Sequence, residues 1–188
     1  MKVKRTFLII GLLPLATTFS LAQSDTGKPE KKTTFGLEAD VVPYILGGYH
    51  GSVVVGNNQW RFRGVYVGLT TPNSLLDDGF IDNKIRVGAV IIDYFFQPNW
   101  KKFFISTGFE YLSGNLSHEQ ATSTSNYNGV LWTAGAGYVW KFHKNFYLAP
   151  HVAFTLRVSG DSQVSLDTFT QSIPAFQPEG GLRAGWHF

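Results

Sequence analysis

The segment Tyr49-His50-Gly51-Ser52 places an imidazole and a hydroxyl two residues apart, the spacing that puts both side chains on one face of a strand. If the chain turns around Leu46, Asp40 lies opposite Ser52 on the same face. A nucleophile, a base and an orienting carboxylate are the groups that acyl transfer or ester hydrolysis requires. Ser52, His50 and Asp40 are therefore candidate catalytic residues. Because a polar strand face is common without any chemistry, we expect no enzymatic activity and assign no residue to catalysis.

Charged side chains alternate with apolar ones along most of the chain. Assigned by strand phase, they fall on a single face with both signs in near balance, and buried charges must pair to be tolerated. We predict an interior polar network made of Glu38, Asp40, His50, Arg61, Arg63, Glu110, Lys141, His151, Arg157, Glu179 and Arg183, with Ser52, Asp93 and His187 on the same face. Such a network would fill and stiffen a barrel, which argues against an open diffusion pore.

The last thirteen residues show the kind of element that positions these groups. From Phe176 to Phe188, apolar and polar side chains alternate, so one face of a strand is apolar and the other is charged. The apolar face consists of Phe176, Pro178, Leu182, Ala184, Trp186 and Phe188, and the polar face of Gln177, Glu179, Arg183 and His187.

The first 22 residues have the features of a secretory signal peptide. Lys2, Lys4 and Arg5 form a positive start, Phe7–Ala16 is apolar, and Ser20-Leu21-Ala22 offers a small-residue cleavage site. Three of the 16 basic residues and none of the 13 acidic residues lie in this segment, so the remaining chain carries 13 of each. The net charge of +3 therefore gives no support to nucleic-acid binding.

Composition narrows the ways in which the chain could cross a membrane. Cysteine is absent, which excludes disulfides, thiol chemistry and a lipoprotein anchor. Charged residues make up 15% of the chain, below the roughly 25% of soluble domains. After the signal, no stretch stays apolar for the roughly 18 residues that a spanning helix requires. A closed β-barrel remains, because it satisfies every backbone group between strands.

Short turns and longer polar loops alternate along the chain and divide it into eight predicted strands. Short turns on one side and long loops on the other are typical of small bacterial outer-membrane barrels. We predict an all-β, eight-stranded antiparallel transmembrane up-and-down β-barrel over 35–188, with short periplasmic turns and longer extracellular loops. A signal peptide (1–22) and a periplasmic leader (23–34) precede it. The strands are expected at 35–44, 48–56, 59–70, 84–97, 102–112, 128–142, 146–158 and 176–188.

The phase of the strands across the short turns supports this assignment. Residues that lie opposite each other in antiparallel neighbours must share a face, so the length of a turn must agree with both strands. The turns at Asn57-Asn58 and His143–Asn145 predict the pairs Val54 with Arg61 and Phe142 with Phe146. Across Asn99-Trp100, the outward phase of Tyr94 and Phe96 agrees with that of Phe103 and Ile105.

Two features fit a regular barrel less well. Strand 59–70 exposes Gly64 and Gly68 and hides two valines, a pattern that predicts a bulge. Pro150 and Pro178 lie within predicted strands, where each removes a ladder hydrogen bond and predicts a local bulge. The alternative is a gap between the seventh and eighth strands that admits a lipid chain sideways. Such a gap would be similar to the proline-weakened lateral gates of the outer-membrane palmitoyl transferase.

The predicted loops carry apolar side chains that can grip a partner or pack over the barrel mouth. They are Leu75, Leu76, Phe80 and Ile81 beside Asp77 and Asp78 in the second loop, and Phe169, Ile173 and Phe176 in and after the fourth. In the third loop, His118-Glu119 offers only two metal ligands, so we predict neither a metal site nor a cofactor.

The chain after the signal resembles the small eight-stranded outer-membrane barrels of the OmpX, OmpW and OmpA type. The resemblance rests on the signal, the two-residue periodicity, the alternation of turn lengths and the terminal Phe188. It implies a monomer in the bacterial outer membrane, in contact with lipid and lipopolysaccharide. It also implies biogenesis by the barrel-assembly machinery, which reads Trp186 and Phe188. Because this architecture hosts adhesins, carriers, enzymes and structural proteins, it assigns no activity.

We therefore expect an integral outer-membrane protein with a packed polar interior and a structural or surface-loop binding role. One alternative is a lipid A acyl-modifying enzyme, acting by acyl transfer or ester hydrolysis. Small barrels that modify lipid A carry such groups near the outer face, although Tyr49–Ser52 lacks the following Asn expected of the lipid A deacylase. The second alternative is a carrier of a small hydrophobic ligand with a lateral opening.

Overall fold

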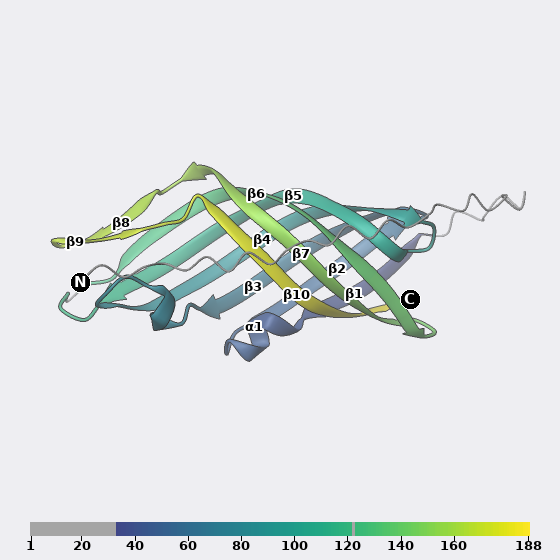
Figure 1. The fold of residues 1–188 in the computed structure, drawn as a ribbon, viewed down its shortest axis with the longest axis horizontal. Helices are drawn as coiled ribbons and strands as arrows, with labels where there is room; N and C mark the ends of the chain where they lie inside the picture. The colour runs from purple at the N-terminus through teal and green to yellow at the C-terminus, as the bar shows by residue number, and fades with distance from the viewer. Residues whose placement is uncertain (1–32, 122) are drawn as a thin grey trace, which may run out of the picture. The chain divides into compact units, whose positions relative to one another are not determined.

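The computed structural model describes residues 33–121 and 123–188, which form a closed antiparallel β-barrel (Figure 1). Each long strand pairs with its neighbours in sequence, and the first strand pairs with the last to close the ring. The eight barrel strands are β1 (Thr34–Asp40), β2 (Tyr49–Asn57), β3 (Trp60–Thr70), β4 (Phe80–Gln97), β5 (Lys101–His118), β6 (Ser125–His143), β7 (Phe146–Gly160) and β10 (Phe176–His187). The predicted eight-stranded, all-β up-and-down architecture is confirmed.

Short elements occupy the longer connections. They are α1 (Val41–Ile45), the 3-10 turn η1 (Asn73–Leu75), and the hairpin strands β8 (Gln163–Leu166) and β9 (Phe169–Ser172). Within the described ranges, no helix is long and apolar enough to cross a membrane. The predicted signal peptide (1–22) lies outside the described residues, as does the predicted leader up to residue 32, while Thr34 already belongs to β1.

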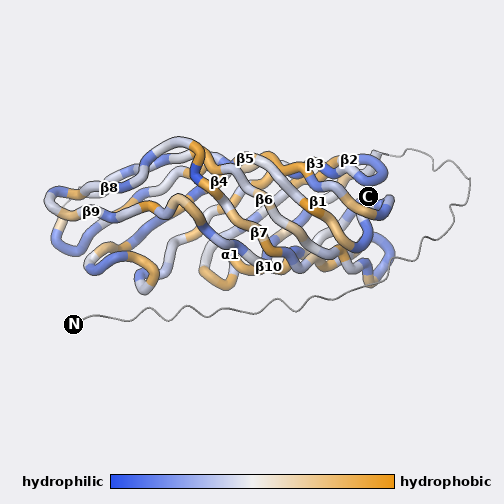
Figure 2. Tube along the Cα trace, turned by 45° about the horizontal axis from the view of Figure 1, so that its top comes forward, coloured by the Kyte–Doolittle hydropathy of each residue, from blue (hydrophilic) through white to orange (hydrophobic). Residues whose placement is uncertain are grey.

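Alternation along each strand sends large apolar side chains outward, while the inner face carries the buried charges together with further apolar residues. Every barrel strand exposes at least one large apolar side chain on its outer face, and we call this set the apolar belt: Phe35, Val53, Phe62, Val90, Phe109, Trp140, Val152 and Phe176. Hydrophilic residues gather at the two ends of the barrel (Figure 2). The outer surface is therefore suited to a hydrocarbon environment between two wet rims.

The strands on one side of the barrel are shorter than those on the other, and we call the short side the low wall. β1 and β2 have 7 and 9 residues, whereas β4, β5 and β6 have 18, 18 and 19. As a result, β10 pairs with β7 from Phe176 to Trp186 but with β1 only from Arg183 to His187. Among the described strands, Phe176–Leu182 thus has no partner on its β1 side, and we call this stretch the open edge.

Helix α1 lies where β1 and β2 would continue, and it contacts β10, β2 and β3. Asp40 ends β1 by capping this helix, because its Oδ1 accepts a hydrogen bond from the Val42 backbone N–H at 3.0 Å. Pro43 follows within the first turn, where its missing N–H costs nothing. The predicted strand 35–44 was therefore too long.

The two predicted strand pairs were wrong in register. Tyr94 and Ile105, both predicted to face outward, pair with each other. Val54 pairs with Arg63 rather than Arg61, because the hairpin turns one residue later than predicted, between Asn57 and Trp60. This shift by two keeps every side chain on its predicted face. Phe146 pairs with His143 rather than Phe142, because the β6–β7 ladder shifts register between Lys141 and His143.

The expected irregularities lie elsewhere. β3 pairs with β2 and β4 without a register shift, so the predicted bulge is absent there and Val65 and Val67 face inward. The β7–β10 ladder runs unbroken past Pro150 and Pro178, which excludes both a bulge and a gap between these two strands. On its other side, Pro150 has no partner in β6, where pairing passes from Gly137–His151 to Trp140–Leu148.

Beyond the barrel wall, the long strands and the β8–β9 hairpin share a second hydrophobic core. Most of the predicted third loop is strand, since β5 continues to His118 and β6 begins at Ser125. His118 stacks on Phe169 with ring centroids 3.7 Å apart. The buried residues of this apolar head are Phe80, Leu112, Leu116, Tyr127, Leu131, Val164 and Leu166. Of the apolar loop residues identified from the sequence, Phe80 is buried in this head and Leu76, Phe169 and Ile173 pack against it, whereas Leu75 and Phe176 are exposed.

Replacing Leu116 with Ala should loosen the apolar head without unfolding the barrel. Leu116 is fully buried, and removing such a side chain costs about 2–5 kcal/mol through lost burial and the cavity left behind. Limited proteolysis should cut the 160–175 segment faster, while the unheated protein keeps its compact mobility on a gel. Leu75→Ala, at an exposed position, should change neither readout.

Candidate functional site

A cluster of four buried charges lies inside the barrel, toward the end formed by the short turns. The Arg61 guanidinium binds Glu38 Oε1 through Nη1 at 2.7 Å and Asp93 Oδ2 through Nε at 2.8 Å. Arg63 holds the same Asp93 with two bonds, Nε to Oδ2 at 2.8 Å and Nη2 to Oδ1 at 3.0 Å. Two positive and two negative charges from β1, β3 and β4 therefore neutralise one another.

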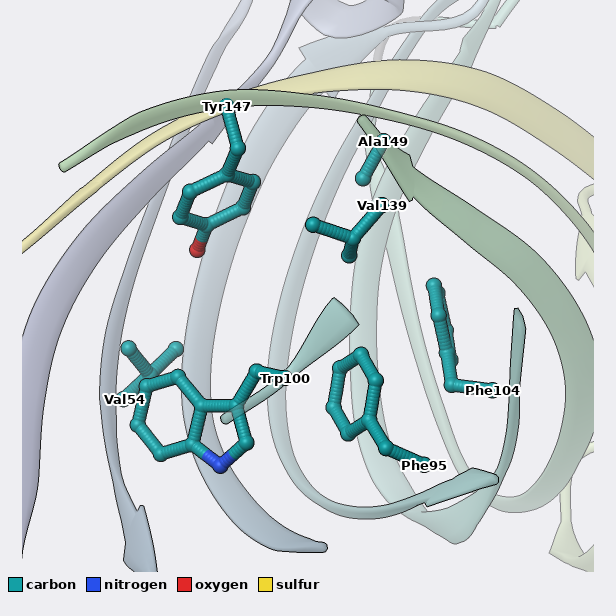
Figure 3. Packing of buried hydrophobic residues seen from close by; sticks show 7 residues of the cluster. All are labelled: Val54, Phe95, Trp100, Phe104, Val139, Tyr147 and Ala149. Atoms are coloured by element: carbon teal, nitrogen blue, oxygen red, sulfur yellow. The ribbon is translucent and has the colours of Figure 1, made fainter. Parts of the chain in front are cut away.

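Aromatic side chains surround this charge cluster. The Arg61 guanidinium lies 4.9 Å from the centroid of the Phe95 ring, 5.5 Å from Phe104 and 5.7 Å from Trp100. The Tyr147 hydroxyl donates a hydrogen bond to Glu38 Oε1 at 2.6 Å. The packed residues shown in Figure 3 are Val54, Phe95, Trp100, Phe104, Val139, Tyr147 and Ala149. We call the charges and this packing together the inner seal.

Trp100 completes the seal from a turn. It follows β4 at a positive φ of 51°, which folds its side chain into the barrel, where only 2% remains exposed. Its Nε1 donates a hydrogen bond to the Trp60 carbonyl oxygen at 3.2 Å. The sequence identified Trp100 only as a turn residue. The one signal of its role was the presence of an aromatic residue in a short polar turn.

The candidate catalytic residues lie together but bond to other groups. The Ser52 hydroxyl donates to the Glu38 carbonyl oxygen at 3.3 Å, and His50 Nδ1 accepts from the Asp40 backbone N–H at 3.1 Å. The Asp40 carboxylate caps α1 and lies 3.4 Å from His151 Nε2 and 3.9 Å from Arg183 Nε. Within the described residues, no hydrogen bond joins the side chains of Ser52, His50 and Asp40.

The other members of the predicted interior network are spread along the barrel. Lys141 donates to the Asn99 carbonyl oxygen at 2.6 Å near the short turns. At the opposite end, Arg157 donates to the carbonyl oxygens of Asp161 and Ile173. Glu110 and Glu179 form no ion pair with any residue that the structure describes. The residues predicted to form one network therefore divide between the inner seal and several separate contacts.

Above the inner seal, the barrel holds a cavity of about 390 Å³. One wall is apolar and comes from β3 and β4, with Val65, Val67, Leu69, Val87, Ala89 and Ile91. The polar wall carries Asp40, His50, Glu110, His151, Glu179 and Arg183, and it adjoins the apolar wall, since His50 pairs with Val67 and Glu110 with Ala89. Val42 and Pro43 of α1, with Pro178 and Gly180 of the open edge, line the cavity on its low-walled side. The sequence did not indicate this cavity.

A second hollow, of about 920 Å³, lies on the outside of the wall formed by β1–β5. It follows the glycines Gly51, Gly64 and Gly88, which carry no side chain on the outward face. Its rim includes the exposed rings of Tyr66 and Phe109. Val65, Ala89 and Glu110 line both this hollow and the interior cavity, so the two share the part of the wall where the glycines leave the outer face bare.

The described ranges contain no group of three or more His, Cys, Asp or Glu side chains able to hold a metal ion. His118, one of the two candidate ligands, packs its ring between Phe169 and Phe80, and its Nδ1 accepts a hydrogen bond from the Gln120 backbone N–H.

Comparison with known proteins identifies the fold. The N-terminal β-barrel domain of Pseudomonas aeruginosa OprF is similar, with a TM-score of 0.54 and 14% identity over 85% of this chain and 100% of that chain. A major outer membrane protein from Thermus thermophilus has a TM-score of 0.50 and 13% identity over 84% and 100% of the two chains. No family model matches the sequence, and no curated protein does. The fold is that of small outer-membrane β-barrels.

Replacing Arg61 with Leu should strongly destabilise the barrel, because Glu38 and Asp93 would each lose a buried partner. Breaking a buried ion pair from one side costs about 3–5 kcal/mol. The free energy of unfolding, measured by urea titration in lipid vesicles, should fall by that amount. Lys101→Leu removes an exposed charge and should change it by no more than about 0.5 kcal/mol. Equal effects of the two substitutions would contradict a structural role of the seal.

Proposed function

We propose that this chain is an integral protein of the bacterial outer membrane that is closed to transport and presents its loops for contacts at the cell surface. The observation that carries this proposal is the inner seal. A neutral group of four charges and the aromatic rings around Arg61 fill the barrel next to its short turns. Eight strands enclose only enough space for side chains, so no continuous water path is expected.

Three observations support the membrane location. The apolar belt covers all eight strands, the sequence begins with a predicted export signal, and proteins of the same fold are named as outer-membrane proteins. We infer contact with outer-membrane lipid and lipopolysaccharide, and biogenesis as a monomer by the barrel-assembly machinery. Trp186 packs edge-on against Phe146 in the belt, while Phe188 stays exposed at the end of the chain.

The surface role rests on the apolar head. β4, β5 and β6 continue past the low wall, and their ends form one hydrophobic core with β8. An ordered surface loses less conformational entropy on binding than a mobile loop, which favours recognition of a partner outside the cell. The partner would meet the polar outer faces of this head, since its apolar side chains are largely buried.

In planar bilayers, the purified protein should show no stepwise channel conductance. The inner seal leaves no water-filled path for ions, whereas a larger porin in the same bilayers conducts steadily. Insertion should be verified in parallel by the slower mobility of the heated protein on a gel. Sustained conductance by the inserted barrel would refute the closed state.

Lipid A should be unchanged by this protein. An acyl-modifying activity is the main alternative, and it would need Ser52 to be activated by His50, whereas each of them bonds to a backbone group. Mass spectra of lipid A should be the same from outer membranes that contain the protein, its Ser52→Ala variant, or neither. An acyl change that disappears with Ser52→Ala would replace the present proposal with an enzymatic function.

A further inference from the structure

We propose that the interior cavity binds one single-chain zwitterionic amphiphile, taken up sideways from the surrounding lipid. This inference rests on the proposed membrane location and adds a binding site that the inner seal does not require. At about 390 Å³, the cavity falls within the roughly 300–1,000 Å³ of small-molecule sites. Its lining combines an apolar wall with a polar wall, and each matches one part of such a molecule.

The guanidinium of Arg183 would bind the anionic part of the ligand. Its side chain lines the cavity, and the residue is only 7% exposed. Its Nη1 has no hydrogen-bond partner among the described residues, while its Nε lies 3.9 Å from Asp40 Oδ2. A buried guanidinium N–H without a partner is costly, so an acceptor is expected there. A phosphate or carboxylate oxygen would meet that need.

The carboxylates of Glu110 and Glu179 would bind the cationic part of the ligand. Both line the same polar wall, and neither forms an ion pair within the described ranges. Arg63, which also lines the cavity, is already held by Asp93. Carboxylates in a low-dielectric interior favour a cation that pairs with them. An ammonium group on the same ligand as the anion provides it.

The apolar wall accounts for the chain of the amphiphile. Val65, Val67 and Leu69 of β3 and Val87, Ala89 and Ile91 of β4 face into the cavity, where interior side chains of such barrels are usually polar. An acyl chain laid along them would cover apolar surface that otherwise meets water. That burial favours binding.

The low wall provides the entrance. The open edge has no strand partner toward β1, and Pro178 and Gly180 of that edge line the cavity beside α1. Phe176 and Leu182 are exposed on the outer face of the same edge, so the entrance lies within the apolar belt rather than at a wet rim. On helix α1 itself, the apolar side chains of Val42, Tyr44 and Ile45 are exposed. An amphiphile in the neighbouring lipid layer can therefore enter without crossing the head.

The test uses the full-length folded protein in a neutral sugar detergent. Lysophosphatidylethanolamine is the zwitterionic probe, and lysophosphatidylglycerol of the same chain length is the anionic one. Native mass spectrometry should show one bound molecule of the zwitterionic probe, held at least about tenfold more tightly than the anionic one. Equal binding of the two probes, or no saturable binding, would overturn the proposal.

Two variants locate the bound molecule. Val67→Trp fills the cavity from the apolar wall and should abolish binding, whereas Val90→Trp puts the same ring on the outer face of β4 and should leave it intact. Glu179→Gln should reduce the preference for the zwitterionic probe while keeping the barrel folded. Unchanged binding in Val67→Trp would exclude this cavity.

Folding is checked for each variant by the mobility of the unheated protein on a gel. Failure of the wild-type protein to insert into lipid vesicles would instead refute the membrane location. The two failures are therefore distinguishable.

Discussion

The structure depends on the neutralisation of Arg61 inside an apolar barrel. An isolated guanidinium in such an interior would cost far more than the net stability of a domain. Glu38 of β1 and Asp93 of β4 bind it from two sides, and Tyr147 of β7 reaches across to the same Glu38 oxygen. Strands distant in sequence are thus tied at one point. The rings around this point exclude water, which strengthens each of these interactions.

The two halves of the barrel differ because their strands have different lengths. Near the short turns all eight strands are present, so side chains can meet across the interior and fill it. Farther along, β1 stops at Asp40 and β2 begins only at Tyr49. The remaining strands enclose the cavity without completing the wall, and α1 occupies part of the missing place. One chain therefore combines a closed end with a hollow that opens sideways.

The sequence predicted the fold and the facing of the side chains because both follow from a two-residue period. The strand register could not be predicted as well. Val54 was expected opposite Arg61 but pairs with Arg63, because a turn shifted by one residue leaves every side chain on the same face and so leaves no trace in the pattern. The interior charges were found by phase, but their partners were not, because pairing depends on how strands tilt around the ring. Trp100 and the apolar head depend on contacts distant in sequence that no local pattern encodes.

The position that fitted the pattern least well proved the most informative. Past Arg63, β3 carries Val65, Val67 and Leu69 on its inner face and Gly64 and Gly68 on its outer face, the reverse of the pattern expected of a membrane barrel. A bulge would have explained this pattern by shifting the phase, yet the ladders on both sides of β3 are continuous. The valines therefore do face inward, into the same cavity as Glu110 and Glu179. Selection for stability alone would have kept polar residues on the inner face of β3. A departure from this alternation without a bulge therefore points to a functional site.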